Sequence, residues 1–375
     1  MKPSPRTDLR SQSLDLLRFP LALFVVAVHV FSPFPYIDTA DMPITEAIFR
    51  FVAAFIKDQS VPVYFFIAGY VFFLGVNMSI DAYAGKLRRR CNSLLMPYLV
   101  WNTVAILYML KVFLPGISSV SEFVGSGGLD LSLSAFIESF WDDRFGIAPY
   151  DTGYTDGTFP IDKPLWFVRD LMIMALISPA IYTLYRLPSR TATAVLAAAT
   201  LVWTAHIPGL GHLAQLLEAF VFFAWGGFMS YHRRDMMLEF KRCFVPSMIL
   251  YPLLATAVMI LSPYRPEAMM YVKSINIIAG LFFFYNLSAW IVSHKHLKAS
   301  SFLASASFFI YCGHFIILDP IARRVFGIIS PQTDLAAATA YIIIYVLIIG
   351  ILLVTYALMR RFTPRLLAPF TGGRV

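Results

Sequence analysis

The chain has 375 residues, of which 58% are hydrophobic and only 14% are charged. Soluble domains carry about 25% charged residues, so this composition excludes an ordinary soluble fold. Apolar runs are spread along the whole chain, which predicts one polytopic membrane domain. The net charge of +8 is therefore expected to reflect charges placed beside a bilayer, and no nucleic-acid partner is expected.

Ten apolar stretches are long enough to be candidate transmembrane helices. They cover residues 14–32, 61–78, 94–114, 164–185, 191–206, 215–231, 244–262, 272–292, 301–318 and 335–359. The segment 44–56 is too short to span and carries Glu46 and Arg50, which favours a helix lying in the interface. The predicted fold class is all-α, with about ten transmembrane helices and both termini on one side.

Lys and Arg are distributed unequally between the two sets of connecting segments. Segments 1–13, 79–93, 186–190, 232–243, 293–300 and 360–375 hold 19 of them, whereas 33–60, 115–163, 207–214, 263–271 and 319–334 hold 7. The positive-inside rule then places both termini in the cytoplasm. Residues 1–375 are expected to form a single membrane domain, with an outer loop at 115–163 and a cytoplasmic tail at 360–375.

The outer loop is acidic, and its chemistry leaves two interpretations open. Its carboxylates are Glu122, Asp130, Glu138, Asp142, Asp143, Asp151, Asp156 and Asp162. The loop either lines a site for an acceptor substrate or forms a solvated cap over the bundle. The three cysteines have no paired or metal-binding spacing, so neither a disulfide framework nor a metal site is expected.

The first apolar stretch carries two ionisable groups inside a predicted span. Arg18 and His29 are 11 residues apart, which puts them on one face of a helix and about 16 Å apart along it. Asp15 lies three residues before Arg18 and can pair with it. His29 is expected near the midplane or slightly beyond, where an ionisable side chain is a candidate functional group. The alternatives are a structural histidine bonded between helices and an arginine that snorkels to the headgroups.

Four cations within five residues follow the second predicted span. Lys86, Arg88, Arg89 and Arg90 either anchor the topology or bind phosphates of a nucleotide-like ligand through charge-assisted hydrogen bonds. No Gly-rich phosphate loop accompanies them, so a nucleotide site of the soluble type is not expected.

Two further stretches carry candidate site residues. Trp166 opens the fourth span with Arg169 and Asp170, all expected at the outer surface, and Trp166 is typical of an interfacial aromatic belt. Near the other end of the chain, Tyr311 and His314 lie three residues apart on one predicted helix face. His314 is a second histidine expected inside the membrane.

Five sequence pieces, taken together and in order, resemble the acyltransferase-3 family of integral-membrane O-acyltransferases. They are LDLLRFPLALFVVAVH, VPVYFFIAGYVFF, KLRRRCNSLLMPYLVW, KPLWFVRDL and SFFIYCGHF. The resemblance implies a ten-helix domain in the bacterial cytoplasmic membrane. It also implies transfer of an acyl group, usually acetyl, from cytoplasmic acyl-CoA to a hydroxyl of an envelope or exported glycan.

The resemblance also implies roles for particular residues. Arg18 and His29 match the essential pair of the family, and Trp166 matches its tryptophan. Lys86 and Arg89 resemble the family's pair of spaced basic residues, with Arg88 or Arg90 as alternatives. Where many members have a Ser-rich stretch and a Glu, this chain has residues 167–170, so the acidic partner of His29 stays open.

The expected chemistry needs a base for the acceptor hydroxyl or a nucleophile that carries the acyl group. His29 suits either role, Arg18 and residues 86–90 are expected to bind the CoA phosphates, and Tyr311 and His314 are expected to support the site. The expected partners are acetyl-CoA or another acyl-CoA, a glycan or lipid-linked oligosaccharide, and membrane lipids. The alternative function is a proton-coupled transporter or flippase of a sugar or glycolipid.

Overall fold

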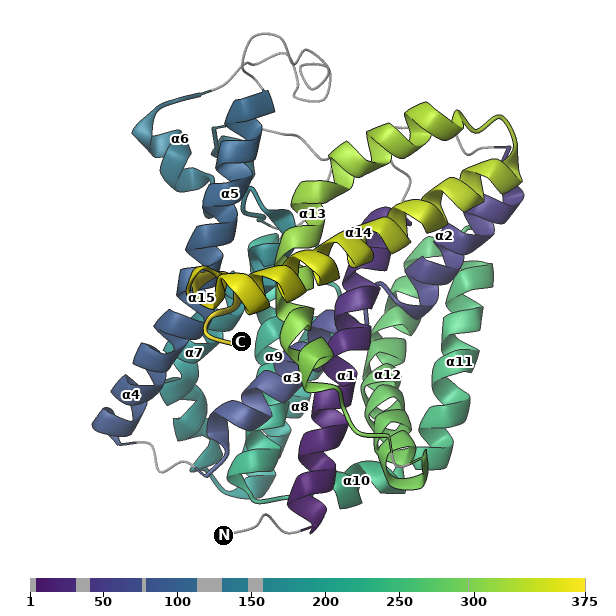
Figure 1. The fold of residues 1–375 in the computed structure, drawn as a ribbon. Coiled ribbons are helices and arrows are strands. Elements are labelled where there is room, and N and C mark those ends of the chain that lie inside the picture. Colours follow the sequence, from purple (N-terminus) through teal and green to yellow (C-terminus); the bar gives the residue numbers. More distant parts are fainter. Residues whose placement is uncertain are drawn as a thin grey trace. The chain divides into compact units, whose positions relative to one another are not determined.

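The computed structural model describes residues 5–31, 41–75, 79–112, 130–147, 158–295 and 297–374, and its regular elements are helices (Figure 1). The first half holds α1 (Pro5–Val30), α2 (Pro43–Phe55), α3 (Ser60–Phe73), α4 (Ile80–Arg90), α5 (Met96–Val112), α6 (Leu133–Glu138) and α7 (Trp166–Tyr185). The second half holds α8 (Ser189–Thr204), α9 (His212–Tyr231), α10 (Met236–Arg242), α11 (Phe244–Leu261), α12 (Pro266–Lys295), α13 (Ser301–Ile329), α14 (Asp334–Phe362) and α15 (Pro364–Thr371). Within the described ranges no strand is present, which confirms the predicted all-α class.

The contacts of the chain group into two compact units, which are described one at a time. Unit 1 comprises Met1–Val76, Thr183–His206 and Val221–Thr355. Unit 2 comprises Asn77–Tyr182, Ile207–Phe220 and Tyr356–Val375. The first predicted motif and the histidine of the last one belong to unit 1, whereas the basic cluster and Trp166 belong to unit 2.

Nine helical segments of the described chain are long and apolar enough to cross a membrane. They correspond to nine of the ten predicted stretches, so the chain is a multi-pass membrane protein. The tenth stretch, 191–206, forms α8, which has only 16 residues and rises about 24 Å, less than a typical hydrocarbon core. Which side the termini face stays a prediction.

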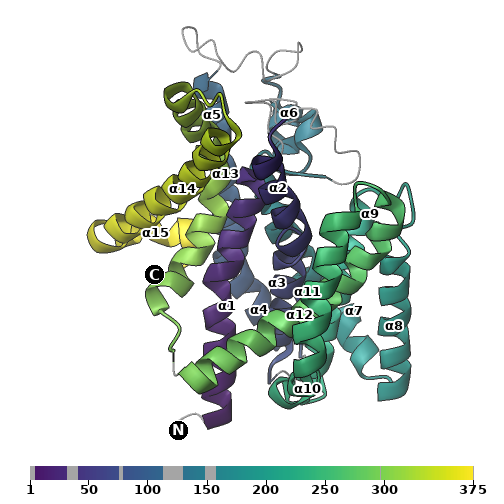
Figure 2. The same cartoon turned by 90° about the vertical axis from the view of Figure 1, so that its right-hand side faces the viewer.

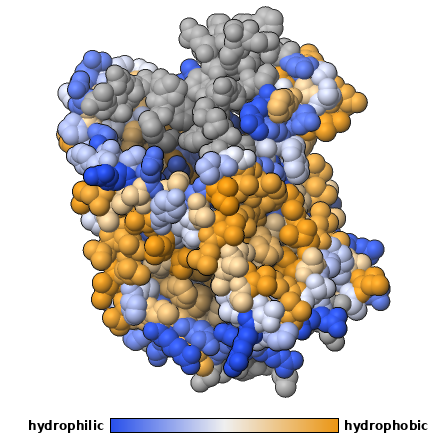
Figure 3. All heavy atoms as spheres, turned by 180° about the vertical axis from the view of Figure 1, so that it is seen from behind, coloured by the Kyte–Doolittle hydropathy of each residue, from blue (hydrophilic) through white to orange (hydrophobic). Residues whose placement is uncertain are grey.

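On the face drawn in Figure 3, many hydrophobic residues are exposed at the surface. Exposed leucine and isoleucine side chains occur on helices such as α11, where Ile249 and Leu253 are more than half exposed. In water such a surface would promote association, but against lipid tails it is the stable arrangement.

The short helix predicted at 44–56 is joined to the next span rather than separate from it. Helices α2 and α3 together form one apolar segment, Pro43–Phe73, interrupted only by a short turn. Gln59 ends that turn, is almost fully buried, and lies so close to Gly280 of α12 that any side chain there would overlap it. Irregular backbone is tolerated at membrane depth where protein covers it, and α12 provides that cover.

The centre of unit 1 is α1, which lies beside α12 and α13 in both views (Figures 1 and 2). The rings of Phe24 and Phe284 meet edge to face at 5.5 Å between α1 and α12. Lower on the same pair of helices, the Ser288 hydroxyl donates a hydrogen bond of 2.7 Å to the Ser13 carbonyl. This packing fixes α1, and with it His29, between two long helices.

Glycines bring α3 and the second half of α9 into direct backbone contact within unit 1. A Cβ at Gly69 would overlap the Phe223 carbonyl, and a Cβ at Gly226 would overlap the Phe66 carbonyl. Small residues at such interfaces let membrane helices approach closely and gain van der Waals contact.

In unit 2, helix α4 continues through a π-helical turn, Cys91–Leu95, into α5. The predicted C-terminal tail is folded there as α15, which packs against α5. The Trp101 indole donates a hydrogen bond of 3.0 Å to the Phe370 carbonyl, so this end of the chain is anchored rather than loose. In the described part of the chain, Cys91, Cys243 and Cys312 form no disulfide bond.

Candidate active site

His29 lies in the last turn of α1, one residue before the helix ends. The apolar segment of this helix runs from Leu9 to Val30, so it begins earlier than the predicted start at residue 14. Arg18 is near the middle of this segment and His29 is near its end. Length and composition alone define the segment, so the depth of both residues in the bilayer stays a prediction.

His314 of α13 is the ring partner of His29 within unit 1. The two imidazole centroids are 5.2 Å apart and tilted by 42°, and Phe315 meets the His29 ring edge to face at 5.3 Å. The two histidines are 285 positions apart in the sequence, and the packing of α13 on α1 brings them together.

The hydrogen bonds of His314 determine where its proton lies. Its Nδ1 is 2.7 Å from the Tyr311 carbonyl and 3.3 Å from the Ile310 carbonyl. A carbonyl only accepts, so Nδ1 carries the hydrogen, and in the neutral ring Nε2 then holds an unshared electron pair. That Nε2 is buried and meets no hydrogen-bond partner among the described residues. The ring is therefore oriented to accept a hydrogen bond at Nε2.

A small hollow lies beside His29. Its volume is about 10 Å³, and its walls include Leu318 and Phe326 of α13 and Tyr341 of α14. This is about the space that a single water molecule or a carbonyl oxygen occupies. Apart from His29, Tyr341 is the polar side chain in the lining, and sequence reasoning missed it because a tyrosine in an apolar run carries no distinguishing signal.

The ring of Tyr341 is fixed by three aromatic neighbours. Phe49 and Phe326 meet it edge to face at 4.9 and 5.2 Å, and Phe31 lies at 6.5 Å. Its hydroxyl is buried and meets no hydrogen-bond partner in the part of the chain that the structure describes. A buried hydroxyl without a partner is costly, which is the usual sign of a group awaiting a water or a ligand.

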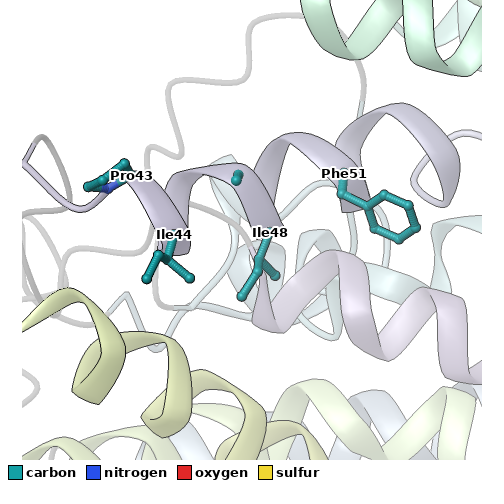
Figure 4. Close-up of a pocket in the computed structure, with 5 residues that line it drawn as sticks. Pro43, Ile44, Ile48 and Phe51 are labelled. Carbon is teal, nitrogen blue, oxygen red and sulfur yellow. The ribbon is translucent and has the colours of Figure 1, made fainter.

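A larger hollow occurs on α2, and its chemistry is different. Pro43, Ile44, Ile48 and Phe51 line it, with Ile44 and Ile48 pointing to the same side of the helix (Figure 4). Ile44 and Phe51 are nearly half exposed. An open apolar face of this kind suits lipid and carries no catalytic group.

The predicted Asp15–Arg18 pair is confirmed, with 2.9 Å between Arg18 Nη1 and Asp15 Oδ1. The Arg18 side chain is 45% exposed, and its carbonyl accepts a hydrogen bond of 2.6 Å from the Tyr64 hydroxyl. A half-exposed guanidinium keeps donors available for an anion after it has formed one surface ion pair, because it has five N–H groups.

The basic cluster of unit 2 lies along α4. Arg88, Arg89 and Arg90 form the last turn of this helix, and Lys86 lies one turn earlier. Arg88 and Arg89 are exposed, whereas Lys86 and Arg90 are half-buried. The π-helical turn that follows changes the helix phase directly after the cluster, a feature frequent at functional sites.

Arg169 and Asp170, which the sequence predicts at the outer end of the fourth span, have buried side chains in unit 2. Arg169 Nε is 2.9 Å from Asp170 Oδ1, and its other nitrogens donate to the carbonyls of Trp141 and Thr158 at 2.8 and 3.1 Å. His212, to which the sequence assigns no role, approaches both charges, with Nε2 2.8 Å from Arg169 and 3.1 Å from Asp170. Arg169 thus ties the outer segment to α7, while Trp166 is half-buried beside Phe159.

Three carboxyls of the predicted outer loop, those of Asp142, Asp143 and Asp162, are also buried. Burial raises the pKa of Asp143 to about 7, although the charge of Lys163 opposes this change. Burial raises the pKa of Asp162 well above its ordinary value. Glu122, Asp151 and Asp156 lie outside the described residues. The described part of the loop is therefore folded within unit 2, and the acceptor-site interpretation stays a prediction.

Tyr311 lies one turn before His314 and is buried. Its carbonyl accepts the Nδ1 hydrogen bond of His314, and the two rings are 6.3 Å apart. Sequence reasoning paired these residues correctly on one face of α13. The support that Tyr311 gives comes from its backbone.

Comparison with known proteins identifies the family. A family model described as an acyltransferase domain matches residues 11–359. The chain is also similar to the succinoglycan biosynthesis protein ExoH of Rhizobium meliloti (strain 1021), with 26% identity over 382 residues, 97% of this chain and 92% of that protein. No solved structure matches it. The matched range contains His29, His314 and the basic cluster, and the chain belongs to the acyltransferase-3 family.

Proposed function

We propose that this membrane acyltransferase moves an acyl group from cytoplasmic acyl-CoA to a hydroxyl of an envelope or exported glycan, with acetyl as the proposed acyl group. Family membership supports acyl transfer, and the name of the similar succinoglycan biosynthesis protein supports a glycan acceptor. The observation that carries the proposal is the pair of adjacent imidazoles, half-buried His29 and buried His314, with His29 lining a hollow of about the size of one water molecule.

His29 is the catalytic base in this proposal. It takes the proton of the acceptor hydroxyl as the oxygen attacks the thioester carbon, and it returns that proton to the departing CoA sulfur. His314 is a positioning residue, because its Nε2 can only accept. In this proposal, an N–H of protonated His29 donates a hydrogen bond to Nε2 of His314. His314 then orients His29 as a carboxylate orients the histidine of a catalytic triad. This arrangement gives His29 a partner without the glutamate that many family members carry.

The donor is expected to reach His29 from the cytoplasmic side. Arg18 lies about 16 Å below His29 along α1, and its half-exposed guanidinium is a candidate contact for a CoA phosphate. Lys86 and Arg88–Arg90 supply further cations of the kind that phosphates prefer. The proposed location is the bacterial cytoplasmic membrane, with the outer segment toward the acceptor.

Deletion of the gene in the source bacterium tests the function without knowledge of the acceptor. The exported and surface glycans are isolated, and their ester-linked acyl groups are measured by NMR. We expect one acyl substituent to be lost and to return with the wild-type gene. His29→Ala should not restore it at equal protein level, since loss of a general base costs about 10² to 10⁴ in rate.

The control is His294→Ala, which removes an exposed histidine at the end of α12 and should restore acylation fully. Unchanged acyl content after deletion contradicts the proposal. Loss of the glycan itself from the surface, with no change in the acylation of what remains, would instead support the transporter alternative.

A further inference from the structure

We propose that Tyr341 is a catalytic residue that donates its phenolic hydrogen bond to the oxyanion of the tetrahedral intermediate. The inference rests on the proposed acyl transfer at His29 and adds a residue that the recognised motifs do not contain. Three observations point to it: the shared hollow, the unpartnered hydroxyl and the fixed ring.

The hollow puts Tyr341 and His29 on the walls of one space. Acyl transfer needs two groups around the reacting carbonyl, a base for the attacking hydroxyl and a donor for the oxygen that becomes negative. A histidine and a tyrosine provide this combination. His314 cannot be the donor, because its Nδ1–H is already bound to the Tyr311 carbonyl and its Nε2 carries no hydrogen.

The surroundings of Tyr341 are those of a preorganised donor. Its hydroxyl is buried and has no hydrogen-bond partner among the residues described, while Phe49 and Phe326 clamp its ring from the edges. A donor that is already desolvated and oriented requires little reorganisation when charge develops, which is the condition under which oxyanion donors are most effective.

The neighbouring Tyr345 shows what an ordinary structural tyrosine of the same helix looks like. One turn further along α14, its hydroxyl donates a hydrogen bond of 3.2 Å to the Leu23 carbonyl of α1. Both tyrosines contact the Phe31 ring. The two differ in whether the hydroxyl already has a protein acceptor, so Tyr345 is a matched control.

The proposed step balances without any further reagent. The acceptor oxygen forms a bond to the thioester carbon, its proton passes to His29, and the carbonyl π electrons move to the oxygen. The Tyr341 hydroxyl donates a hydrogen bond to that oxygen and keeps its own proton. When the intermediate collapses, the C–S bond breaks, the sulfur takes the proton from His29, and the ester is released.

The test compares Tyr341→Phe with Tyr345→Phe in detergent-purified protein. Acetyl-CoA is the donor, membranes of the gene-deletion strain supply unacylated acceptor, and release of the CoA thiol is measured per folded molecule. We expect Tyr341→Phe to lower kcat by about 10² to 10³ with little change in the KM for acetyl-CoA. Its melting temperature should stay equal or rise, because an unpartnered buried hydroxyl is removed.

Tyr345→Phe should behave in the opposite way, with a lower melting temperature and a kcat close to wild type. If Tyr341 only holds a structural water, its phenylalanine variant will lose stability and keep wild-type activity per folded molecule, which overturns the inference. A wild-type protein that releases no thiol would instead count against the proposed function, so the two failures are distinguishable.

Discussion

The proton of His314 is located by two backbone carbonyls that lie three and four residues earlier on its own helix. Nε2 of the neutral His314 ring can therefore only accept a hydrogen bond. A histidine held in one tautomer is costly to bury unless its free nitrogen is used, since an unpartnered buried acceptor lowers stability by about 1 to 3 kcal/mol. This requirement links the local geometry of α13 to the chemistry of His29.

His314→Asn tests that link. The asparagine amide can still donate to the Tyr311 carbonyl, but the variant has no acceptor at the position of Nε2. We expect kcat to fall by about 10 to 10², less than for loss of His29 itself, with folding retained. Thiol release across a pH series checks this, because loss of the partner should move the apparent pKa that governs kcat. His206→Asn, which alters a histidine bonded to Ser274, should change neither quantity.

Asp143 gives a pH prediction for the outer segment of unit 2. Burial raises its pKa to about 7, so between about pH 4 and pH 7 the folded state holds a proton that the unfolded state has released. Stability must then fall as the pH rises through this window, by at most about 1.4 kcal/mol per pH unit.

Melting temperatures of wild type and Asp143→Asn between pH 5 and pH 9 measure this effect. The wild type should lose stability relative to the variant as the pH rises, because asparagine does not ionise. The charges that act on Asp143 are those of Asp142 and Lys163. If the difference in melting temperature between the two proteins stays constant from pH 5 to pH 9, Asp143 is ionised over the whole range.

Sequence reasoning selected candidate site residues where a polar side chain interrupts an apolar run. Arg18, His29 and His314 are of this kind. It could not find His212 or Tyr341, because a histidine at a helix start and a tyrosine in a span are both common. Their partners lie far away in the sequence, 43 residues from His212 to Arg169 in the first case, and only tertiary packing brings them together.

At the scale of elements, the interface of α3 and α9 depends on glycine. Gly226→Ala would place a methyl group onto the Phe66 carbonyl, and neither backbone can move without shifting its helix. We expect destabilisation of about 1 to 3 kcal/mol or failure to fold. Gly350→Ala in α14 is the control, because a Cβ there meets nothing within 4 Å and alanine favours the helix by about 0.5 to 1 kcal/mol.

Thermal unfolding in detergent distinguishes the two variants. A lower melting temperature for Gly226→Ala together with an unchanged or higher one for Gly350→Ala is the expected result. Equal behaviour of the two would mean that α3 and α9 do not approach as closely as the structure has them.

The lengths of most elements could be predicted because an apolar run of about 20 residues has few alternatives to a membrane helix. Their ends were less predictable. Helix α13 continues to Ile329, well past the predicted end at residue 318. Beyond that point Asp319 and Arg323 are polar, which ends an apolar run but not a helix, and at 3.0 Å they form an i,i+4 pair that supports it.

At the scale of the whole molecule, the number of membrane crossings depends on whether α8 spans the bilayer. If its 16 residues do not span, every later segment changes side. The Lys and Arg of the connecting segments would then divide 12 to 14 between the cytoplasmic and outer sides, instead of 19 to 7. Because the positive-inside rule expects a clear excess on the cytoplasmic side, the charge distribution favours a crossing by α8 despite its short length.

Cysteine labelling in intact spheroplasts decides between the two arrangements. With Cys243 and Cys312 replaced by Ser, the exposed Cys91 should react with an impermeant maleimide only after permeabilisation, whereas Ser134→Cys on α6 should react from outside. Both results are independent of α8. Arg365→Cys, which is exposed on α15, distinguishes the two arrangements. With ten crossings it should react only after permeabilisation, like Cys91. With nine crossings it should react from outside, like Ser134→Cys. If Arg365→Cys does not react with the maleimide in intact spheroplasts, α8 crosses the membrane. The excess of Lys and Arg on the cytoplasmic side then determines the topology although α8 is shorter than a typical span.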